Sequence, residues 1–267
     1  MPDNDLFAIR KRITAAQQTR KITRTMELIA SSRLMRGRAL LAHSGEWLRH
    51  MEEAVKCLPE LCFTPEYRMK KGDKKAYIVF GGSKGLSGSY SPSLLQYAKP
   101  VVSGHTVIAV GSGAAAFFPA AHSVFGDEIP CDEFARSIVK AAMAVVENGE
   151  ADEVYLVYTK GVTQVTARLL PLEQEEDVSD GVISEPSAEA LAPMLLEEYC
   201  EAILYEANLQ AFVSEQIARV AAMDSATQNA DEIIEDLQAK YNRIRQSTIT
   251  HEIITVGNAT RGDGSRV

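Results

Sequence analysis

The chain has 267 residues, 46% hydrophobic residues and a formal net charge of −8 at pH 7. These values are ordinary for a soluble globular protein and allow one large domain or two small ones. The acidic balance argues against binding of nucleic acid, which requires a basic face. Four cysteines without a C-x-x-C spacing predict reduced thiols in a cytoplasmic compartment and no metal site: Cys57, Cys62, Cys131 and Cys200.

The first segment, residues 1–57, is predicted to be a long basic helix. Its apolar residues recur at spacings of three and four, as in Ile9, Ile13 and Ala16, and no proline interrupts the pattern. A second row with the same spacing includes Ile22 and Met26. Residues 1–50 hold ten Lys or Arg against four acids, whereas residues 173–236 hold seventeen acids against one base. Opposite charges attract, so the two ends of the chain are matched for pairing.

The middle of the chain, residues 74–172, is predicted to be a small Rossmann-like α/β domain with a mostly parallel sheet. Residues 58–73, rich in lysine with two prolines, form a connection to it. Buried-type strands are expected at 76–80, 106–110 and 153–158, and helices between them at 91–98, 112–118 and 131–148. This alternation is typical of parallel strands joined by helical crossovers. An acidic, turn-rich connection at 173–191 follows.

The last long segment, residues 192–258, is predicted to be a second helix, followed by a flexible tail at 259–267. It shows the 4-3-4-3 spacing of a coiled-coil seam at Met223, Thr227, Ala230, Ile234, Leu237, Tyr241 and Ile244. About fifty residues of helix would measure roughly 75 Å, whereas a compact chain of this length would be about 47 Å across. Small and polar seam residues also make the seam weak. We therefore expect an antiparallel coiled coil of the terminal helices that is completed by a partner.

Two glycine-rich turns suggest an alternative function in nucleotide binding. Gly111 and Gly113 follow a predicted strand in the order G-x-G-x-x-A, which is used to bind dinucleotides. An acid should end the next strand, but Asp127 and Asp132 lie in a turn with no predicted strand before them. The sequence after Phe80, GGSKGLSGS, resembles a phosphate loop without the required G-K-[ST] order. The histidines show no metal-binding spacing. A small dinucleotide-binding α/β protein therefore stays as the alternative, and a coiled-coil scaffold without motor function is a second one.

Both ends of the chain resemble the gamma subunit of rotary F-type ATP synthases. The N-terminal stretch IRKRI, followed by TRKITRTMELIASSR, is similar to the first helix of that family. The stretches SEQIAR, AMDSATQNA and YNRIRQSTITHE are similar to its last helix. The middle resembles the family more weakly, through SKGLSGSY, VIAVGSGAAAFF and LVYTKGVTQVTARLLPLE. The resemblance covers nearly the whole chain.

The resemblance implies a noncatalytic rotor subunit without a cofactor. Such a subunit forms the central stalk inside a hexamer of alpha and beta subunits, and it rests on the epsilon subunit and the membrane c-subunit ring. Its rotation couples ion flow through the ring to ATP synthesis or hydrolysis. It also implies a peripheral location at the cytoplasmic side of a bacterial-type cell membrane.

The resemblance also assigns partner-contact roles to individual residues. The residues that match the family's contacts with the beta subunit are Arg24, Met26, Arg33, Arg219, Arg245 and Gln246. Lys84, Gly85, Leu86 and Gly88 match the glycine loop of the globular foot domain. That loop departs from the family at three positions, because Ser83-Lys-Gly-Leu-Ser-Gly88 stands where Asp-Arg-Gly-Leu-Cys-Gly is usual.

Overall fold

The computed structural model divides the chain into two compact units. Unit 1 consists of Met1–Ile29 and Ala221–Val267, and unit 2 of Ala30–Val220. The structure describes residues 2–59, 62–63, 67, 72–82, 84–124, 129–172, 185 and 187–263, with side chains between 5 and 254. Most of the predicted connections at 58–73 and 173–191, and the last residues of the predicted tail, lie outside the described residues.

The chain is an α/β protein, as the sequence predicts, with ten helices and strands in the part that the structure describes. In chain order they are α1 Pro2–Lys56, β1 Lys75–Phe80, α2 Tyr90–Val101, β2 Thr106–Val110, α3 Ser112–Phe117, β3 His122–Val124, α4 Asp132–Glu147, β4 Glu153–Lys160, β5 Thr163–Leu170 and α5 Ala188–Asp263. Helix α5 begins before its predicted start at residue 192, because Ser187 caps it: its Oγ accepts a hydrogen bond of 3.3 Å from the amide of Ala190.

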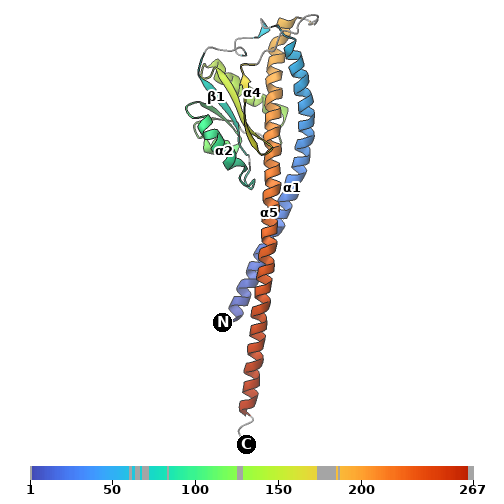
Figure 1. Ribbon diagram of the computed structural model, residues 1–267, viewed down its shortest axis with the longest axis vertical. Coiled ribbons are helices and arrows are strands. Elements are labelled where there is room, and N and C mark those ends of the chain that lie inside the picture. The colour runs from blue at the N-terminus through green and yellow to red at the C-terminus, as the bar shows by residue number, and fades with distance from the viewer. Residues whose placement is uncertain are drawn as a thin grey trace. The chain divides into compact units, whose positions relative to one another are not determined.

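Unit 2 contains a five-stranded sheet in the order β3-β2-β1-β4-β5 (Figure 1). Strands β1, β2, β3 and β4 are parallel, and β5 pairs antiparallel with β4. The three predicted strands are confirmed. The two edge strands, β3 and β5, were not predicted from the sequence. β3 is three residues long with mostly exposed side chains, and β5 has exposed threonines at positions 163 and 166, so neither strand shows the apolar run of a central strand.

The sheet of unit 2 is buried on both faces. On one face, Ile78, Ile108 and Leu156 form a hydrophobic core together with side chains of α4 and α5. On the other face, Val79 and Val157 pack with side chains of α2. Successive side chains of a strand point to opposite faces, which is why neighbouring residues of β1 belong to different cores. Both faces are apolar, so the central strands read as continuous hydrophobic runs.

Two glycine-containing turns at the carboxyl ends of β1 and β2 pack directly against each other. The amide of Gly113 donates a hydrogen bond of 2.9 Å to the carbonyl oxygen of Gly82. A Cβ atom on Gly113 would lie 2.7 Å from that oxygen, and one on Gly81 would lie 2.5 Å from the amide nitrogen of Ala114. The absence of side chains therefore permits this close approach of two backbones.

Replacing Gly113 with alanine should destabilise the chain by about 1–3 kcal/mol, because the new methyl group overlaps a backbone oxygen that cannot move alone. Chemical denaturation monitored by circular dichroism measures this change. Gly45→Ala is the matched control: Gly45 lies inside α1 with no atom within 4 Å of an added Cβ. That substitution should stabilise the helix by about 0.5–1 kcal/mol. Equal stability of the two variants would contradict this packing.

Unit 1 is an antiparallel pair of helical segments from α1 and α5. Arg20 forms an ion pair of 2.8 Å with Asp231, and the hydroxyl of Thr23 lies 2.7 Å from that of Thr227. The partner number falls as the α1 number rises, so the segments run in opposite directions. The predicted seam is confirmed: Met223, Ala230 and Ile234 are buried, and the other seam positions are partly buried.

The row of α1 that contains Ile22 and Met26 does not belong to this seam. Its side chains are exposed, whereas Ile9, Ile13 and Ala16 are half-buried. Two rows with the same helical spacing therefore differ in burial within the same helix.

The parts of α1 and α5 within unit 2 are also paired in antiparallel fashion. A Cβ on Gly37 would lie 3.0 Å from the ring of Phe212 and 3.0 Å from Val213. Further along, Trp47 and Tyr205 contact each other edge to face, with ring centroids 6.1 Å apart. Arg136 of α4 donates a hydrogen bond of 2.8 Å to Glu201 of α5. These contacts connect α5 to both α1 and the α/β domain.

Candidate functional site

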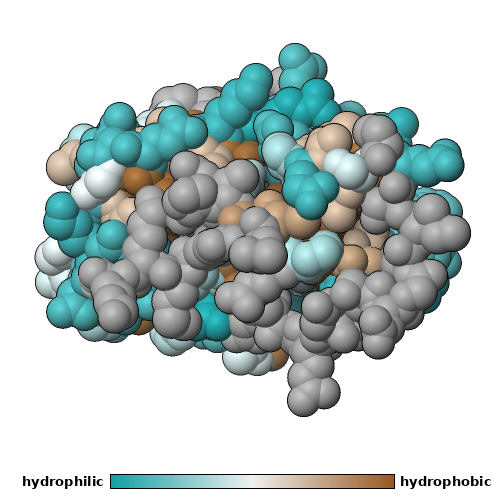
Figure 2. Space-filling view, turned by 90° about the horizontal axis from the view of Figure 1, so that it is seen from above, coloured by the Kyte–Doolittle hydropathy of each residue, from teal (hydrophilic) through white to brown (hydrophobic). Residues whose placement is uncertain are grey.

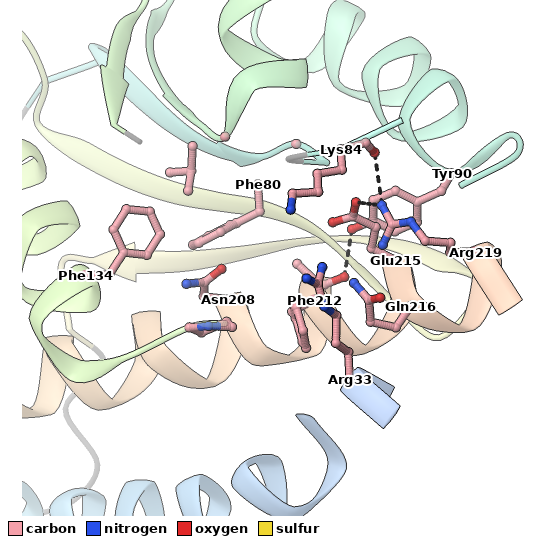
Figure 3. Close-up of a pocket in the computed structure, with 15 residues that line it drawn as sticks. Arg33, Phe80, Lys84, Tyr90, Phe134, Asn208, Phe212, Glu215, Gln216 and Arg219 are labelled. Carbon is pink, nitrogen blue, oxygen red and sulfur yellow. Dashed lines mark hydrogen bonds and ion pairs between the residues drawn. The ribbon is translucent and has the colours of Figure 1, made fainter. Parts of the chain in front are cut away.

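The first candidate site is the contact between Arg219 of α5 and the loop that follows β1. The guanidinium of Arg219 donates hydrogen bonds to the carbonyl oxygens of Lys84, at 3.0 Å, and Gly85, at 3.4 Å. It also pairs with the carboxylate of Glu215, one turn earlier on the same helix (Figure 3). Arg219 is 8% exposed and Glu215 is buried as well. The five donors of a guanidinium allow these simultaneous contacts.

The loop held by Arg219, residues 84–88, has an unusual backbone. Leu86 has a φ of 66° and Gly88 a φ of 57°. Left-handed backbone is unfavourable for a leucine, so the surrounding contacts must hold this conformation. The side chain of Leu86 is nevertheless 62% exposed. The loop thus exposes the apolar side chain of Leu86, while hydrogen bonds from Arg219 hold its backbone.

Tyr90, at the start of α2, provides a second anchor for the same region. Its hydroxyl donates a hydrogen bond of 2.9 Å to the carbonyl oxygen of Ala211 in α5. Burial and the nearby negative charge of Glu215 raise the pKa of Tyr90 above its ordinary value. The phenol therefore stays protonated and remains a donor at neutral pH. Contacts on both sides of the loop connect it to α5.

The second candidate site is the surface of unit 1. Met26 is 38% exposed, and Arg24 is exposed while it pairs with Glu27 at 2.8 Å. Arg245 and Gln246 are exposed on α5. Exposed apolar side chains accompany them on the same unit: Phe7, Ile22, Leu28, Ile29, Ile233, Ile249, Ile253 and Ile254. Such a concentration of apolar side chains on a two-helix unit is typical of a surface that contacts another protein.

The residues assigned by resemblance thus divide between the two units. Arg24, Met26, Arg245 and Gln246 belong to unit 1. Arg33 and Arg219 belong to unit 2, where both line one pocket together with Lys84. The roles of Glu215 and Tyr90 were not predicted from the sequence. The spacing of Glu215 and Arg219, four residues apart on a helix, predicts an ion pair and could have indicated Glu215. Nothing in the sequence indicates that Tyr90 contacts α5.

The Gly111–Gly113 turn lacks the geometry of a dinucleotide site. Helix α3 is six residues long, and the amide of Gly113 is occupied by the carbonyl oxygen of Gly82. Contrary to the sequence analysis, a strand does precede Asp127 and Asp132, because β3 spans His122–Val124. Asp127 lies outside the described residues, and Asp132 is the first residue of α4.

The part of the chain that the structure describes shows neither a metal-binding cluster nor a membrane-spanning helix. No group of three or more His, Cys, Asp or Glu side chains there is arranged to hold a metal ion. No helix in that part of the chain is long and apolar enough to cross a lipid bilayer.

Sequence comparison gives one consistent result over almost the whole chain. Residues 5–260 match the profile of a family described as ATP synthase. An ATP synthase gamma chain of Ruminiclostridium cellulolyticum is 32% identical, and the alignment covers 94% of this chain and 96% of that one. The ATP synthase gamma chain of Kineococcus radiotolerans is 35% identical, with 98% of each chain covered. The chain belongs to the ATP synthase gamma chain family.

Solved structures agree with the fold of this gamma chain. A chain of the mitochondrial ATP synthase of Euglena gracilis, solved as an assembly of OSCP, F1 and c-ring, aligns with a TM-score of 0.74. The two are 17% identical, and the alignment covers 99% of this chain and 97% of that one. A chain from the central stalk and c-ring of the Tetrahymena thermophila enzyme has a TM-score of 0.57 at 20% identity, covering 77% and 99%. Membership in the gamma chain family disfavours the alternative of a dinucleotide-binding protein.

Proposed function

We propose that this gamma chain is the central-stalk rotor subunit of an ATP synthase and is noncatalytic by itself. In this role it turns inside a hexamer of alpha and beta subunits, and it rests on the epsilon subunit and the membrane c-subunit ring. Ion flow through the ring drives rotation toward ATP synthesis, and hydrolysis drives it in reverse. The complex would place the chain peripherally at the cytoplasmic side of the cell membrane.

The observation that carries this proposal is the surface of unit 1. Its helices pair through a seam that contains Thr227 and Ala230, while Ile22 and Met26 point away from the seam. A helix pair with a weak seam and exposed apolar side chains gains stability when other protein surrounds it. Contacts that differ around the two helices can favour different conformations of the surrounding subunits as the pair turns.

Residue roles follow as part of the same proposal. Arg24, Met26, Arg245 and Gln246 would contact beta subunits from unit 1, and Arg33 would do so from unit 2. Because Arg219 is buried, its contribution would pass through the 84–88 loop, where Leu86 is exposed. In the same proposal, the terminal helices at residues 1–57 and 192–258 would form the shaft of the stalk, and the α/β domain at residues 74–172 would form its foot.

Reconstitution with the alpha and beta subunits of the same organism tests the proposed function. We expect a complex with one copy of this chain per alpha/beta hexamer, and ATP-driven ion pumping when the membrane part is added. A coiled-coil scaffold without motor function would leave pumping absent. Failure to associate with the alpha and beta subunits, measured by native mass spectrometry, would contradict the proposal.

A further inference from the structure

Unit 2 contains a small pocket that the rotor role does not use. It has a volume of about 40 Å³ and lies where the carboxyl ends of β1 and β2 approach α5. Its apolar walls include Phe80, Val110, Phe134 and Phe212 (Figure 3). Because a water molecule needs about 10–15 Å³ of cavity volume, the pocket has room for about three of them. It is far too small for a nucleotide.

Two amide side chains of α5 are buried at this pocket. Asn208 is 8% exposed and Gln216 is 2% exposed. Figure 3 shows both on the side of α5 that faces the sheet, and both belong to the pocket lining. Among the residues that the structure describes, no group forms a hydrogen bond with Nδ2 of Asn208 or with Oε1 of Gln216. A buried polar atom without a partner costs free energy and is rare in native proteins, so these two atoms require a partner inside the pocket.

The two amide atoms differ in the partner that they need. Nδ2 of Asn208 is a donor and needs an acceptor, whereas Oε1 of Gln216 is an acceptor and needs a donor. An anion without a proton could serve only Asn208, and a metal cation could serve only Gln216. A water molecule both donates and accepts, so water can serve both atoms. Eight residues of α-helix rise about 12 Å, so more than one water molecule is needed to reach both amides.

The charged groups of the lining do not require a bound ion. Arg219 pairs with Glu215 and donates hydrogen bonds to the carbonyl oxygens of Lys84 and Gly85. The side chains of Arg33 and Lys84 also line the pocket, and both residues have interaction partners of their own. An ion that enters a largely apolar pocket loses its hydration, which costs free energy unless a charged group compensates it. A neutral occupant avoids this cost.

We propose that this pocket is a hydration site in which a short row of ordered water molecules connects the two amides. One water molecule would accept a hydrogen bond from Nδ2 of Asn208, and another would donate one to Oε1 of Gln216. The row would separate α5 from the apolar side chains at the strand ends and leave neither amide unpaired. Buried waters of this kind make about three hydrogen bonds each and are an integral part of a fold. The site does not depend on the rotor role, since its residues belong to unit 2 alone.

A crystal structure of the full-length chain, at a resolution that shows ordered water, tests this site directly. We expect water density within hydrogen-bonding distance of Nδ2 of Asn208 and of Oε1 of Gln216. A protein group bonded to both amide atoms in place of water, an ion in the pocket, or no density there would overturn the proposal.

Magnetic relaxation dispersion of the water oxygen counts the long-lived buried waters of the same chain in solution. The double variant Asn208→Leu with Gln216→Met keeps the size of both side chains and removes both amides, so it should lose about three of these waters. Gln210→Met is the matched control, because Gln210 is a partly buried amide of α5 outside the pocket lining. This variant should keep the wild-type count, and circular dichroism verifies that each variant is folded. Equal counts in the folded double variant and the wild type would overturn the site.

Discussion

Replacing Arg219 with alanine is expected to lower the free energy of unfolding by about 3–5 kcal/mol, the cost of removing one partner from a buried ion pair. Arg219 and Glu215 are both buried, and they pair within α5. Without the guanidinium, the carboxylate of Glu215 would be a buried charge without its partner. The carbonyl oxygens of Lys84 and Gly85 would lose their donor at the same time. Urea denaturation monitored by circular dichroism measures the difference.

An exposed ion pair provides the control for Arg219. Arg20 and Asp231 pair at 2.8 Å, but both side chains are about half exposed. Arg20→Ala should therefore cost less than about 1 kcal/mol, because water and salt screen a surface pair. If the two substitutions changed the unfolding free energy equally, the burial of the Arg219–Glu215 pair would not be what matters.

The 84–88 loop offers a second measurement on the same variants. Amide hydrogen exchange of this loop should accelerate in Arg219→Ala, because the left-handed conformation of Leu86 loses its support. Arg219→Lys should give an intermediate result, since an ammonium retains the charge but cannot make the forked contacts of a guanidinium. Exchange in the loop that stays unchanged in both variants would show that Arg219 does not position it.

Replacing both Arg245 and Gln246 with alanine should weaken assembly with the beta subunits by about 2 kcal/mol or more, the range measured for arginine hot spots at interfaces. That value corresponds to roughly a 30-fold loss in affinity, and ATP-driven ion pumping in reconstituted vesicles should fall with it. Both side chains are exposed on α5, so their removal should leave the thermal stability of the isolated chain unchanged. Native mass spectrometry of the complex and a vesicle pumping assay measure the two effects.

Lys240 and Ser247 provide a control on the same helix. Both residues are exposed. Each residue of an α-helix turns by about 100°, so Lys240 and Ser247 share one side of α5, which lies about 100° or more from both Arg245 and Gln246. Lys240→Ala with Ser247→Ala should therefore leave pumping close to that of the wild type. Equal loss in both double variants would mean that the contact is not specific to Arg245 and Gln246.

Two features could not be predicted from sequence patterns: the edge strands β3 and β5, and the exposure of the row of α1 that contains Ile22 and Met26. Strands β1, β2 and β4 were predictable because burial on both faces requires continuous apolar runs such as TVIAV. Strands β3 and β5 have a neighbour on one side only, and their exposed positions permit polar residues. The row with Ile22 and Met26 has the spacing of a helix seam, yet it is exposed, because spacing identifies a helix face and not what covers it.

The sequence by itself determined the two long helices, their antiparallel pairing through the Met223–Ile244 seam and the parallel α/β domain between them. These features depend on local periodicity and on charge, which are properties of the chain read in order. Only the tertiary structure decided the environment of Arg219 and the anchor at Tyr90. In these places α5 meets residues that lie more than a hundred positions earlier in the chain. Which side chains meet across such a distance depends on the packing of the whole unit, and no local pattern records it.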